Sequence, residues 1–397
     1  MKRVHLVILA VCLVALLACG TAPAPTLTEG STDLDLDPLR ALLQGFVDDG
    51  ELPGASLLLA QHGNIIFEEA YGWADIDAEK PFTTDTMAAI WSDTKSLSAT
   101  CVMILVDDGK ISLDDPVSKY IPAYGERTIR GTGVKASSPT IRQLLEHTSG
   151  IVSDLEEPKY MDIVGNMDLT LAEVVDLIAQ EELVAEPGTR YSYGEADFQA
   201  AGRIVELVSG QPFDVFMQER LLTPLGMTDT TFRPSPEQAL RIAQTYSPGA
   251  SGFRTFWPYD PEVEINLIMV AGGLYSTLRD LAVYLQMHLN GGAYGSTRIL
   301  SSAAVAEMQK DGTGDVAVGY SPDRLEREHR GPGWRVDRAG QDGQALSISH
   351  GGIMGTLTWI DIDRDLVGIF FTNAFPTGRT LREVVHEKVL EIFPASE

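Results

Sequence analysis

Apolar runs at both ends of the chain predict β-strands, and the spacing of apolar residues between them predicts helices. Two runs, at 55–60 and 65–70, flank a turn at 62–64, which predicts a β-hairpin. Near the other end, three further runs predict successive strands at 345–350, 357–362 and 367–371. Strands from such distant parts of one chain predict a single antiparallel sheet whose edges derive from both ends.

Between these strands, apolar positions recur at the spacing that is typical of amphipathic helices. One helix is predicted to begin at Ser92, and others are predicted at 39–47, 141–147, 171–178, 198–208, 213–222, 280–289 and 380–392. The predicted fold class is therefore α+β. We expect an antiparallel β-sheet flanked by helices, with an inserted, mainly helical subdomain at about 111–265.

The first residues have the character of an export signal. Lys2 and Arg3 precede an apolar stretch, 4–18, that is too short to span a bilayer comfortably. The stretch ends at Cys19 in a sequence that resembles a bacterial lipobox, which makes Cys19 the expected lipidated residue. An ordinary secretory signal that is cleaved nearby is the alternative. We predict a signal peptide at 1–18, a tether at 19–37 and a folded domain at 38–397.

These features predict an exported lipoprotein, periplasmic or at the cell surface, that meets a membrane only through its N-terminal lipid. The net charge of −26, from 30 basic and 56 acidic residues, argues against nucleic acid as a partner. The seven histidines have no metal-ligand spacing and no Gly-rich phosphate loop occurs, so no cofactor is expected. Cys101 lies in an apolar run and is expected in the core.

The first candidate for chemistry is the sequence Ser92-Asp93-Thr94-Lys95 at the start of a predicted helix. Ser92 and Lys95 are three residues apart, so on a helix the hydroxyl and the amine lie on one face. A serine becomes a good nucleophile when a base takes its proton, and a partly desolvated lysine is such a base. Backbone N–H groups at a helix start also stabilise developing negative charge. The alternative is an exposed helix N-terminus that Ser92 caps.

Further motifs occur in an order that is known from one enzyme family. The segment 187–195 contains Tyr193 and Glu195, and His350-Gly351-Gly352 ends a predicted strand. With Ser92 to Lys95 they resemble the serine β-lactamase-like family, and so do three other segments, 113–117, 144–151 and 271–277. The closest similarity is to the branch of class C β-lactamases, D-alanyl-D-alanine carboxypeptidases and family VIII carboxylesterases. The resemblance runs from about Leu39 to the C-terminus and implies a β-lactamase/transpeptidase-like fold.

The resemblance also implies a role for each motif residue. Ser92 is the expected acylated nucleophile, Lys95 shares its proton, and Tyr193 helps to activate the serine and passes the proton to the leaving group. The backbone N–H groups of Ser92 and Ile353 are the expected oxyanion hole. Substrate binding is expected of Glu195, His350, Gly351 and Gly352.

Each role has a structural alternative. Tyr193 could be a packed aromatic residue with a satisfied hydroxyl. His350 alternates with Leu346 and Ile348 along a strand and could be a core histidine, although the two glycines after it allow a ligand or backbone to approach closely. His147 is expected to belong to a helix terminus and not to the site.

Two departures from the family pattern bear on the substrate. Glu195 stands where the Y-x-N motif has asparagine, and an ionised carboxylate only accepts hydrogen bonds. Beside Lys95, Glu195 would also raise the pKa of the lysine and make it a poorer base. His350 stands where many members have the lysine of K-T-G, and a histidine is mostly neutral at pH 7. Both changes remove features that favour β-lactam binding.

The expected function is therefore that of an exported serine hydrolase acting on a small-molecule ester, amide or peptide, with a carboxylesterase-like activity first. The alternatives are a D-amino-acid peptidase or D-alanyl-D-alanine carboxypeptidase, then a β-lactamase and, outside the class, a non-catalytic binding lipoprotein. Several side chains are candidates for an apolar acyl pocket, with core packing as the alternative. They are Trp91, Tyr246, Phe253, Phe256, Trp257, Tyr275, Trp334 and Met354.

Overall fold

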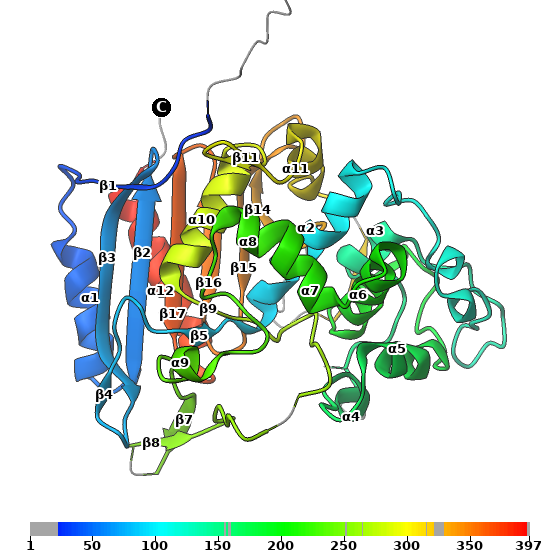
Figure 1. The fold of residues 1–397 in the computed structure, drawn as a ribbon, viewed down its shortest axis with the longest axis horizontal. Helices are drawn as coiled ribbons and strands as arrows, with labels where there is room; N and C mark the ends of the chain where they lie inside the picture. The colour runs from blue at the N-terminus through cyan, green and yellow to red at the C-terminus, as the bar shows by residue number, and fades with distance from the viewer. Residues whose placement is uncertain are drawn as a thin grey trace, which may run out of the picture.

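The computed structural model describes residues 23–154, 156–157, 160–250, 252–263, 265–314, 316–320 and 329–394. A nine-stranded sheet crosses this part of the chain, with helices on both of its faces (Figure 1). Along the sheet the strands are β1 (Thr28–Glu29), β3 (Asn64–Asp75), β2 (Gly54–Gln61), β17 (Leu366–Thr372), β16 (Leu357–Asp361), β15 (Ala345–Gly351), β14 (Trp334–Ala339) and β13 (Arg330–Gly331), with β4 (Lys80–Pro81) beside β3. Within this sheet, as far as the described residues go, β1 pairs with β3 in parallel and the other neighbouring strands pair antiparallel. The predicted α+β class is confirmed.

The position of β2 in the sheet explains why its residues 57–60 are all apolar. Leu58 and Ala60 belong to one hydrophobic cluster, whereas Leu57 and Leu59 belong to another. Successive side chains of a strand point to opposite faces, so both faces of β2 are covered. β17 pairs with β2 along its whole length, which joins the N-terminal hairpin to the three C-terminal strands. All five strands lie where the sequence predicts them.

Different helices cover the two faces. On one face, α1 (Asp37–Asp48) and α12 (Thr377–Ile392) pack Leu43 and Val385 against the cluster that contains Leu57. On the other face lie α10 (Leu278–Leu289) and α2 (Thr94–Asp107). α2 is buried at every residue from Thr94 to Leu105, as expected of a helix surrounded by other elements. Anything attached to its first turn is therefore held rigidly.

A mainly helical region lies beside α2, on the right of Figure 1. It contains α3 (Ile141–Leu145), α4 (Met161–Val164), α5 (Leu171–Ala179), β6 (Arg190–Ser192), α6 (Ala196–Ser209) and α7 (Phe213–Met217). α8 (Thr223–Leu225) and α9 (Pro236–Ala239) follow along the chain and lie nearer the middle of the view, with α9 just below β5. Thr140 and Thr170 begin α3 and α5 with capping boxes. The helix predicted at 213–222 is α7 followed by a π-helical turn, Gln218–Leu222.

The remaining strands and α-helices are short. They are β5 (Ala88–Ala89), β7 (Tyr246–Gly249), β8 (Gly252–Thr255), β9 (Tyr275–Ser276), β10 (Ala293–Tyr294), β11 (Thr297–Arg298), α11 (Ser302–Met308) and β12 (Ala317–Tyr320). β7 and β8 form a hairpin, and β5 pairs with β9 ahead of the Ser92 turn.

The segment predicted as a tether needs a correction. β1 pairs with β3 through Thr28 and Glu29, and the Leu27 N–H donates to the Tyr294 hydroxyl at 3.0 Å. These contacts are largely made by the backbone, so the hydrophobic pattern gives no sign of them. The predicted signal peptide and Cys19 lie outside the described residues. Within the described ranges, every helix falls short of the length and apolar character that crossing a membrane requires.

Candidate active site

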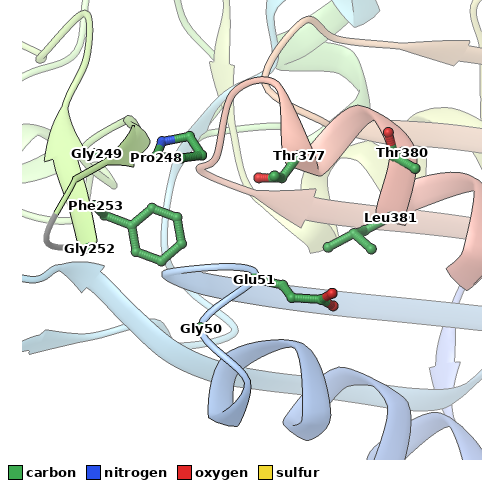
Figure 2. Close-up of a pocket in the computed structure, with 9 residues that line it drawn as sticks. All are labelled: Gly50, Glu51, Pro248, Gly249, Gly252, Phe253, Thr377, Thr380 and Leu381. Atoms are coloured by element: carbon green, nitrogen blue, oxygen red, sulfur yellow. The ribbon is translucent and has the colours of Figure 1, made fainter.

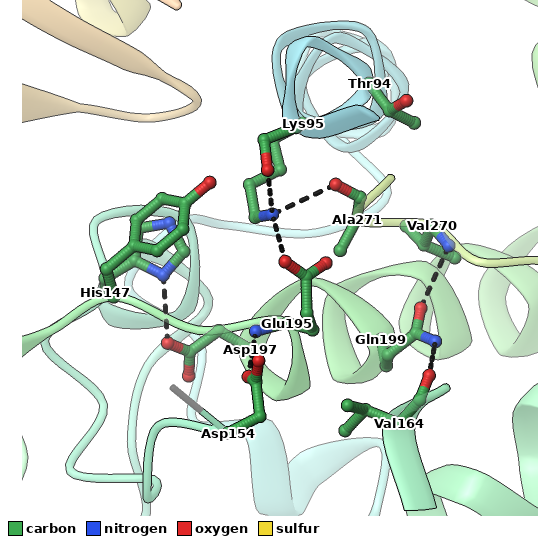
Figure 3. A network of polar contacts seen from close by, with 12 residues as sticks. Thr94, Lys95, His147, Asp154, Val164, Glu195, Asp197, Gln199, Val270 and Ala271 are labelled. Carbon is green, nitrogen blue, oxygen red and sulfur yellow. Dashed lines mark hydrogen bonds and ion pairs between the residues drawn. The ribbon is translucent and has the colours of Figure 1, made fainter. Parts of the chain in front are cut away.

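Ser92 and Lys95 meet at the start of the buried helix, as their spacing predicts. Ser92 lies in the 3-10 turn η1 (Trp91–Asp93), which runs directly into α2. The Lys95 Nζ atom lies 3.3 Å from Ser92 Oγ, 3.0 Å from Glu195 Oε1 and 3.0 Å from the Ala271 carbonyl oxygen. Figure 3 shows Lys95 reaching from its helix toward Glu195 and Ala271. The amine thus connects the serine to the carboxylate.

Lys95 is held as an ammonium ion in this position. Burial by itself lowers the pKa of Lys95, but the charge of Glu195 and the neighbouring Tyr193 outweigh it and keep the pKa above its usual value. An ammonium group has three donors, and Ser92, Glu195 and Ala271 accept them. Burial raises the pKa of Glu195, although Lys95 opposes that rise. The geometry agrees with the expectation that Glu195 makes Lys95 a poorer base.

Tyr193 completes this group. It lies between β6 and α6, and Lys95 Nζ is 4.9 Å from the centroid of its ring. The guanidinium carbon of Arg330 lies 5.5 Å from the same centroid. Both cations are within the range of a favourable interaction with the ring. The structure therefore brings together Ser92, Lys95, Tyr193 and Glu195, which the sequence places far apart.

His147 lies against Tyr193, although the sequence analysis assigns it to a helix terminus. The two ring centroids are 4.6 Å apart, and His147 Nδ1 is 3.3 Å from Asp197 Oδ2. Asp197 also accepts a hydrogen bond from the Ser149 hydroxyl at 2.5 Å. Burial lowers the pKa of His147 and raises the pKa of Asp197. These residues form a buried support behind Tyr193, and the motif at 144–151 was the signal that could have found it.

The glycines of the third motif come up against the Ser92 turn. A Cβ atom on Gly352 would lie 2.6 Å from the Ile90 carbonyl oxygen and 3.2 Å from the Trp91 Cβ atom. A side chain at this position would therefore push the two segments apart. Gly352 and Ile353 line the same cavity as Ser92, so the two expected oxyanion donors belong to one site.

Asp93 ties the η1 turn to β16, and the sequence analysis did not single it out. Its carboxylate accepts hydrogen bonds from the hydroxyls of Thr356 at 2.7 Å and Thr358 at 2.8 Å. The Thr356 hydroxyl is also 3.1 Å from the Gly352 N–H nitrogen and 3.2 Å from the Ile90 carbonyl oxygen. Burial raises the pKa of Asp93 to about 7. One network therefore positions both the Ser92 turn and the Gly352 segment.

A cavity of about 470 Å³ opens over this network, which is a size that suits a small molecule. Seven of the predicted site residues line it: Ser92, Tyr193, Glu195, His350, Gly351, Gly352 and Ile353. Burial, together with the charges of Arg330 and Lys95, lowers the pKa of His350 well below its usual range. The imidazole is therefore neutral, as expected. Among the described residues, no three His, Cys, Asp or Glu side chains are grouped to hold a metal ion.

Four arginines also line this cavity, and sequence reasoning missed them. They are Arg330, Arg335, Arg379 and Arg382. They come from β13, β14 and α12, so no local motif marks them. Two of them are already paired, because Arg335 lies 2.6 Å from Asp337 and Arg382 lies 3.1 Å from Glu383. Arg382 also donates a hydrogen bond to the Gly352 carbonyl oxygen at 2.9 Å.

A separate hollow of about 510 Å³ lies between the β7–β8 hairpin, Glu51 and the first turns of α12. Figure 2 shows the Phe253 ring extending into it. None of the described residues that line it belongs to the predicted site.

The side chains that are candidates for an apolar acyl pocket fall into two groups. Trp91 and Trp257 line the Ser92 cavity, whereas Tyr246, Trp334 and Met354 are buried core residues.

A family model described as Beta-lactamase matches residues 39–389. The chain belongs to the β-lactamase family. The resemblance that the motifs indicate is thereby confirmed, and this β-lactamase-family protein is a serine hydrolase. A relative named "Putative D-alanyl-D-alanine carboxypeptidase" from Escherichia coli (strain K12) is 28% identical, over 90% of this chain and 88% of the relative.

Solved structures share the fold of this β-lactamase-family protein. EstCE1, described as a hydrolase with promiscuous acyltransferase activity, superimposes with a TM-score of 0.74 at 24% identity, over 88% of this chain and 97% of that one. A putative beta-lactamase from Bacteroides dorei DSM 17855 gives a TM-score of 0.67 at 27% identity, over 90% of this chain and 99% of that one. The octameric penicillin-binding protein homologue from Pyrococcus abyssi gives 0.70 at 23% identity, over 91% and 80%.

Proposed function

We propose that this protein is an exported hydrolase that forms an acyl-enzyme at Ser92 and cleaves an ester. The observation that carries the proposal is the continuous contact from Ser92 Oγ through Lys95 Nζ to Glu195 Oε1, over 3.3 and 3.0 Å, beside a cavity of substrate size. A hydroxyl connected in this way can give up its proton while it attacks a carbonyl carbon.

Glu195 is the terminal proton acceptor in this mechanism. Lys95 carries three protons already and accepts another only if it releases one. As the bond between Ser92 Oγ and the carbonyl carbon forms, the Ser92 proton moves to Lys95 and one Lys95 proton moves to Glu195 Oε1. Burial prepares Glu195 for this step, because it raises the pKa of the carboxyl group.

Tyr193 is the acid that protonates the leaving group in this mechanism. When the bond between the carbonyl carbon and the leaving oxygen breaks, the Tyr193 hydroxyl gives its proton to that oxygen. Lys95 then returns a proton to Tyr193, and Glu195 returns one to Lys95. The net result is that one proton has moved from Ser92 to the alcohol. Water then attacks the acyl-enzyme by the same steps in reverse, which frees Ser92 and the acid.

The backbone N–H groups of Ser92 and Ile353 would bind the oxyanion that forms in both steps. The Asp93–Thr356–Gly352 hydrogen bonds support this role, because they fix the two backbone segments relative to each other. Donors that are fixed before the reaction stabilise the transition state without the cost of reorganisation.

An ester is the preferred substrate for two reasons. Glu195 stands where an amide would donate to an acylamide carbonyl, and its carboxylate has no hydrogen to donate. His350 is neutral, so it lacks the charge with which the lysine of K-T-G would meet a substrate carboxylate. Both features weaken β-lactam recognition and leave ester cleavage unaffected.

A peptidase for substrates that end in a D-amino acid is the second candidate. The four arginines of the cavity wall are compatible with it, because a guanidinium group has five donors and can bind a terminal carboxylate while it keeps its partner within the protein. The name of the Escherichia coli relative points in the same direction.

We also propose that the chain is a lipoprotein anchored through Cys19, on the basis of the apolar 4–18 segment and the lipobox-like sequence that follows it. Metabolic labelling with a palmitate analogue tests this. We expect label and membrane association in the native protein and neither in Cys19→Ser. If the native protein is soluble and unlabelled, the proposal is wrong, and 1–18 is instead an ordinary secretory signal that is cleaved.

Covalent labelling by a fluorophosphonate tests the catalytic proposal. We expect the native protein to be labelled and Ser92→Ala to remain unlabelled, because only an activated serine reacts with the reagent. A panel of p-nitrophenyl esters, D-amino-acid amides, a D-alanyl-D-alanine peptide and nitrocefin then ranks the substrates. Labelling that persists in Ser92→Ala overturns the assignment, and cleavage of the peptide alone would favour the second candidate.

A further inference from the structure

Glu195 begins α6, but its side chain does not cap the helix. It stands at the N-cap position without a side-chain hydrogen bond to the helix, because its carboxylate reaches Lys95 instead. In a capping box, the side chain three residues further along accepts the hydrogen bond of the N-cap N–H. Here that residue is Phe198, which has no acceptor. The Glu195 N–H therefore needs a partner from another part of the chain.

Asp154 is that partner. Its Oδ1 atom accepts the hydrogen bond of the Glu195 N–H at 2.7 Å, and Figure 3 shows Asp154 below the Glu195 backbone. The neighbouring Ser153 hydroxyl donates to the Tyr193 carbonyl oxygen. A Cβ atom on Gly194 would lie 2.9 Å from Asp154 Oδ1 and 3.2 Å from the Ser153 Cα atom, so a side chain there would push the two segments apart. Asp154 and Ser153 thus hold both the proposed acid and the proposed proton acceptor.

The Asp154 carboxyl group is buried and only partly satisfied. The residue is 1% exposed, and its Oδ2 atom makes no hydrogen bond with any described residue. Burial raises the pKa of Asp154, but the Glu195 N–H, the charge of Lys95 and the Asp154 N–H oppose that rise. Hydrogen bonds to a carboxylate favour its ionised form. Asp154 therefore places a negative charge next to the start of α6.

This charge acts on the Glu195 side chain. Burial raises the pKa of Glu195, the charge of Lys95 opposes the rise, and the charge of Asp154 adds to it. Like charges disfavour one another, so Glu195 holds a proton more tightly beside an ionised Asp154. A carboxylate that holds a proton more tightly is a stronger base, which suits the terminal acceptor of the Ser92 proton.

The other titratable groups around Glu195 do not add negative charge in the same way. They are Lys95 from α2, Tyr193 and Asp197 from its own segment and, in the cavity wall, Arg330 and His350. Burial raises the pKa of Asp197 well above its usual value, so this carboxyl group is neutral at pH 7. His350 is neutral as well, because burial lowers its pKa. Lys95 and Arg330 contribute positive charges.

We infer that Asp154 is a positioning residue that holds the Glu195 backbone in place and whose negative charge makes Glu195 a stronger proton acceptor. This inference rests on the proposed acyl-enzyme reaction at Ser92. Asp154 acts through Glu195 and not on the substrate. Its two effects can be separated, because asparagine keeps an acceptor oxygen and loses the charge, whereas alanine loses both.

The pH profile of kcat/KM for p-nitrophenyl acetate tests the effect of the charge. In Asp154→Asn, Glu195 loses the like charge that raises its pKa, so the acidic limb should move to lower pH by about one unit. A purely structural role of Asp154 would lower stability or kcat and leave the limb in place.

Asp162→Asn is the matched control for the charge. It removes one negative charge from an exposed position on α4, and Asp162 is not among the described residues that line the cavity. The acidic limb of this variant should coincide with that of the native protein. A limb that moves equally in Asp162→Asn and Asp154→Asn would reflect net charge alone and contradict a specific role of Asp154.

Asp154→Ala tests the effect of the hydrogen bond. Without an acceptor for its N–H, the Glu195 segment is held less firmly, so kcat should fall by about tenfold while KM changes little. Asp154→Asn should keep most of the native kcat at its own pH optimum. A native kcat in Asp154→Ala would exclude the positioning role. If Asp154→Ala does not fold, the limb of Asp154→Asn decides alone.

The ¹³C NMR signal of the Glu195 carboxyl carbon separates this inference from the proposed function, because it needs no substrate. The signal is assigned by its loss in Glu195→Gln, and it should titrate at lower pH in Asp154→Asn than in the native protein. If p-nitrophenyl acetate is cleaved in a Ser92-dependent way and neither limb nor signal moves, the inference is wrong and the proposed function stands. If the signal moves but cleavage does not depend on Ser92, the proposed function fails and the action of Asp154 on Glu195 stands.

Discussion

The Lys95 ammonium group lies 3.0 Å from the Glu195 carboxylate, and both are enclosed by α2, α6 and the segment at Ala271. The Lys95 side chain is 0% exposed and that of Glu195 is 16% exposed, so water screens the pair weakly. Each partner determines the protonation of the other, and both are within reach of Ser92 through Lys95 Nζ. The protonation of this pair should therefore determine the pH dependence of the reaction.

Glu195→Gln should move the acidic limb of the kcat/KM profile to higher pH. In the proposed mechanism the native protein needs ionised Glu195, whose pKa burial raises above its usual value, so activity should fall as the pH falls through that pKa. Without the carboxylate, only Tyr193 still opposes the lowering of the Lys95 pKa by burial, and neutral Lys95 becomes the base. The acidic limb of the profile then reflects the pKa of Lys95, and a lysine ammonium group loses its proton at higher pH than a carboxyl group does. An unshifted limb would show that Glu195 does not take part in proton transfer.

Lys95→Met should destabilise the fold more than the double variant Lys95→Met/Glu195→Gln. Removing one partner of a buried ion pair leaves the other charge uncompensated, at a cost of about 3–5 kcal/mol. Neutralising Glu195 as well removes most of that cost. Urea unfolding at pH 7 measures both values, and the gap should narrow as the pH falls, because Glu195, whose pKa burial raises, then becomes protonated in the folded state. Equal losses in both variants at pH 7 would contradict an ionised pair.

Glu195→Asn should raise the turnover of nitrocefin relative to that of p-nitrophenyl acetate. Asparagine restores a donor for the acylamide carbonyl of the cephalosporin, whereas the acetate has no such group. Initial rates with both substrates at one pH give the ratio. A nitrocefin rate that is unchanged or lower would mean that the carboxylate is not what weakens β-lactam recognition.

Much of the fold could be predicted from local patterns. The five sheet strands at 54–75 and 345–372 are confirmed. An apolar run such as that at Leu57 and Leu58 is required because both faces of β2 are covered, whereas β3 carries Glu68 and Glu69 and is recognised by the turn that joins it to β2. β1 could not be predicted in this way, because its pairing with β3 uses backbone groups that every residue has.

The candidate site likewise has some residues that the sequence predicts and others that it does not. Ser92, Lys95, Tyr193 and Glu195 could be found because each belongs to a short motif with its own spacing. Asp93 could not, since its hydrogen-bond partners Thr356 and Thr358 lie more than 260 residues away. The arginines of the cavity likewise have no local signal, because only the tertiary fold brings β13, β14 and α12 to one wall.

Asp93→Asn should make stability less dependent on pH. Burial raises the pKa of Asp93 to about 7, whereas an unfolded Asp titrates near 4. Because the folded state holds this proton more tightly, its contribution to stability is fully present below about pH 4 and is lost as pH rises through 7. The native protein should lose stability between pH 5 and 8 relative to Asp93→Asn, by urea midpoint. Parallel pH curves for the two proteins would contradict a protonated buried Asp93.

Thr356→Val should lower kcat by about tenfold while KM changes little. The variant keeps the shape of the side chain but loses the hydroxyl that contacts Asp93, the Gly352 N–H and the Ile90 carbonyl oxygen. The Gly352 segment is then less firmly positioned, and poorly aligned oxyanion donors cost transition-state stabilisation more than substrate binding. Thr358→Val is the matched control, because its hydroxyl bonds Asp93 at 2.8 Å and otherwise only reaches the His350 carbonyl at 3.5 Å. If kcat falls equally in both variants, the loss of the hydrogen bond to Asp93 explains the effect. The hydrogen bond between Thr356 and Gly352 then contributes nothing to catalysis.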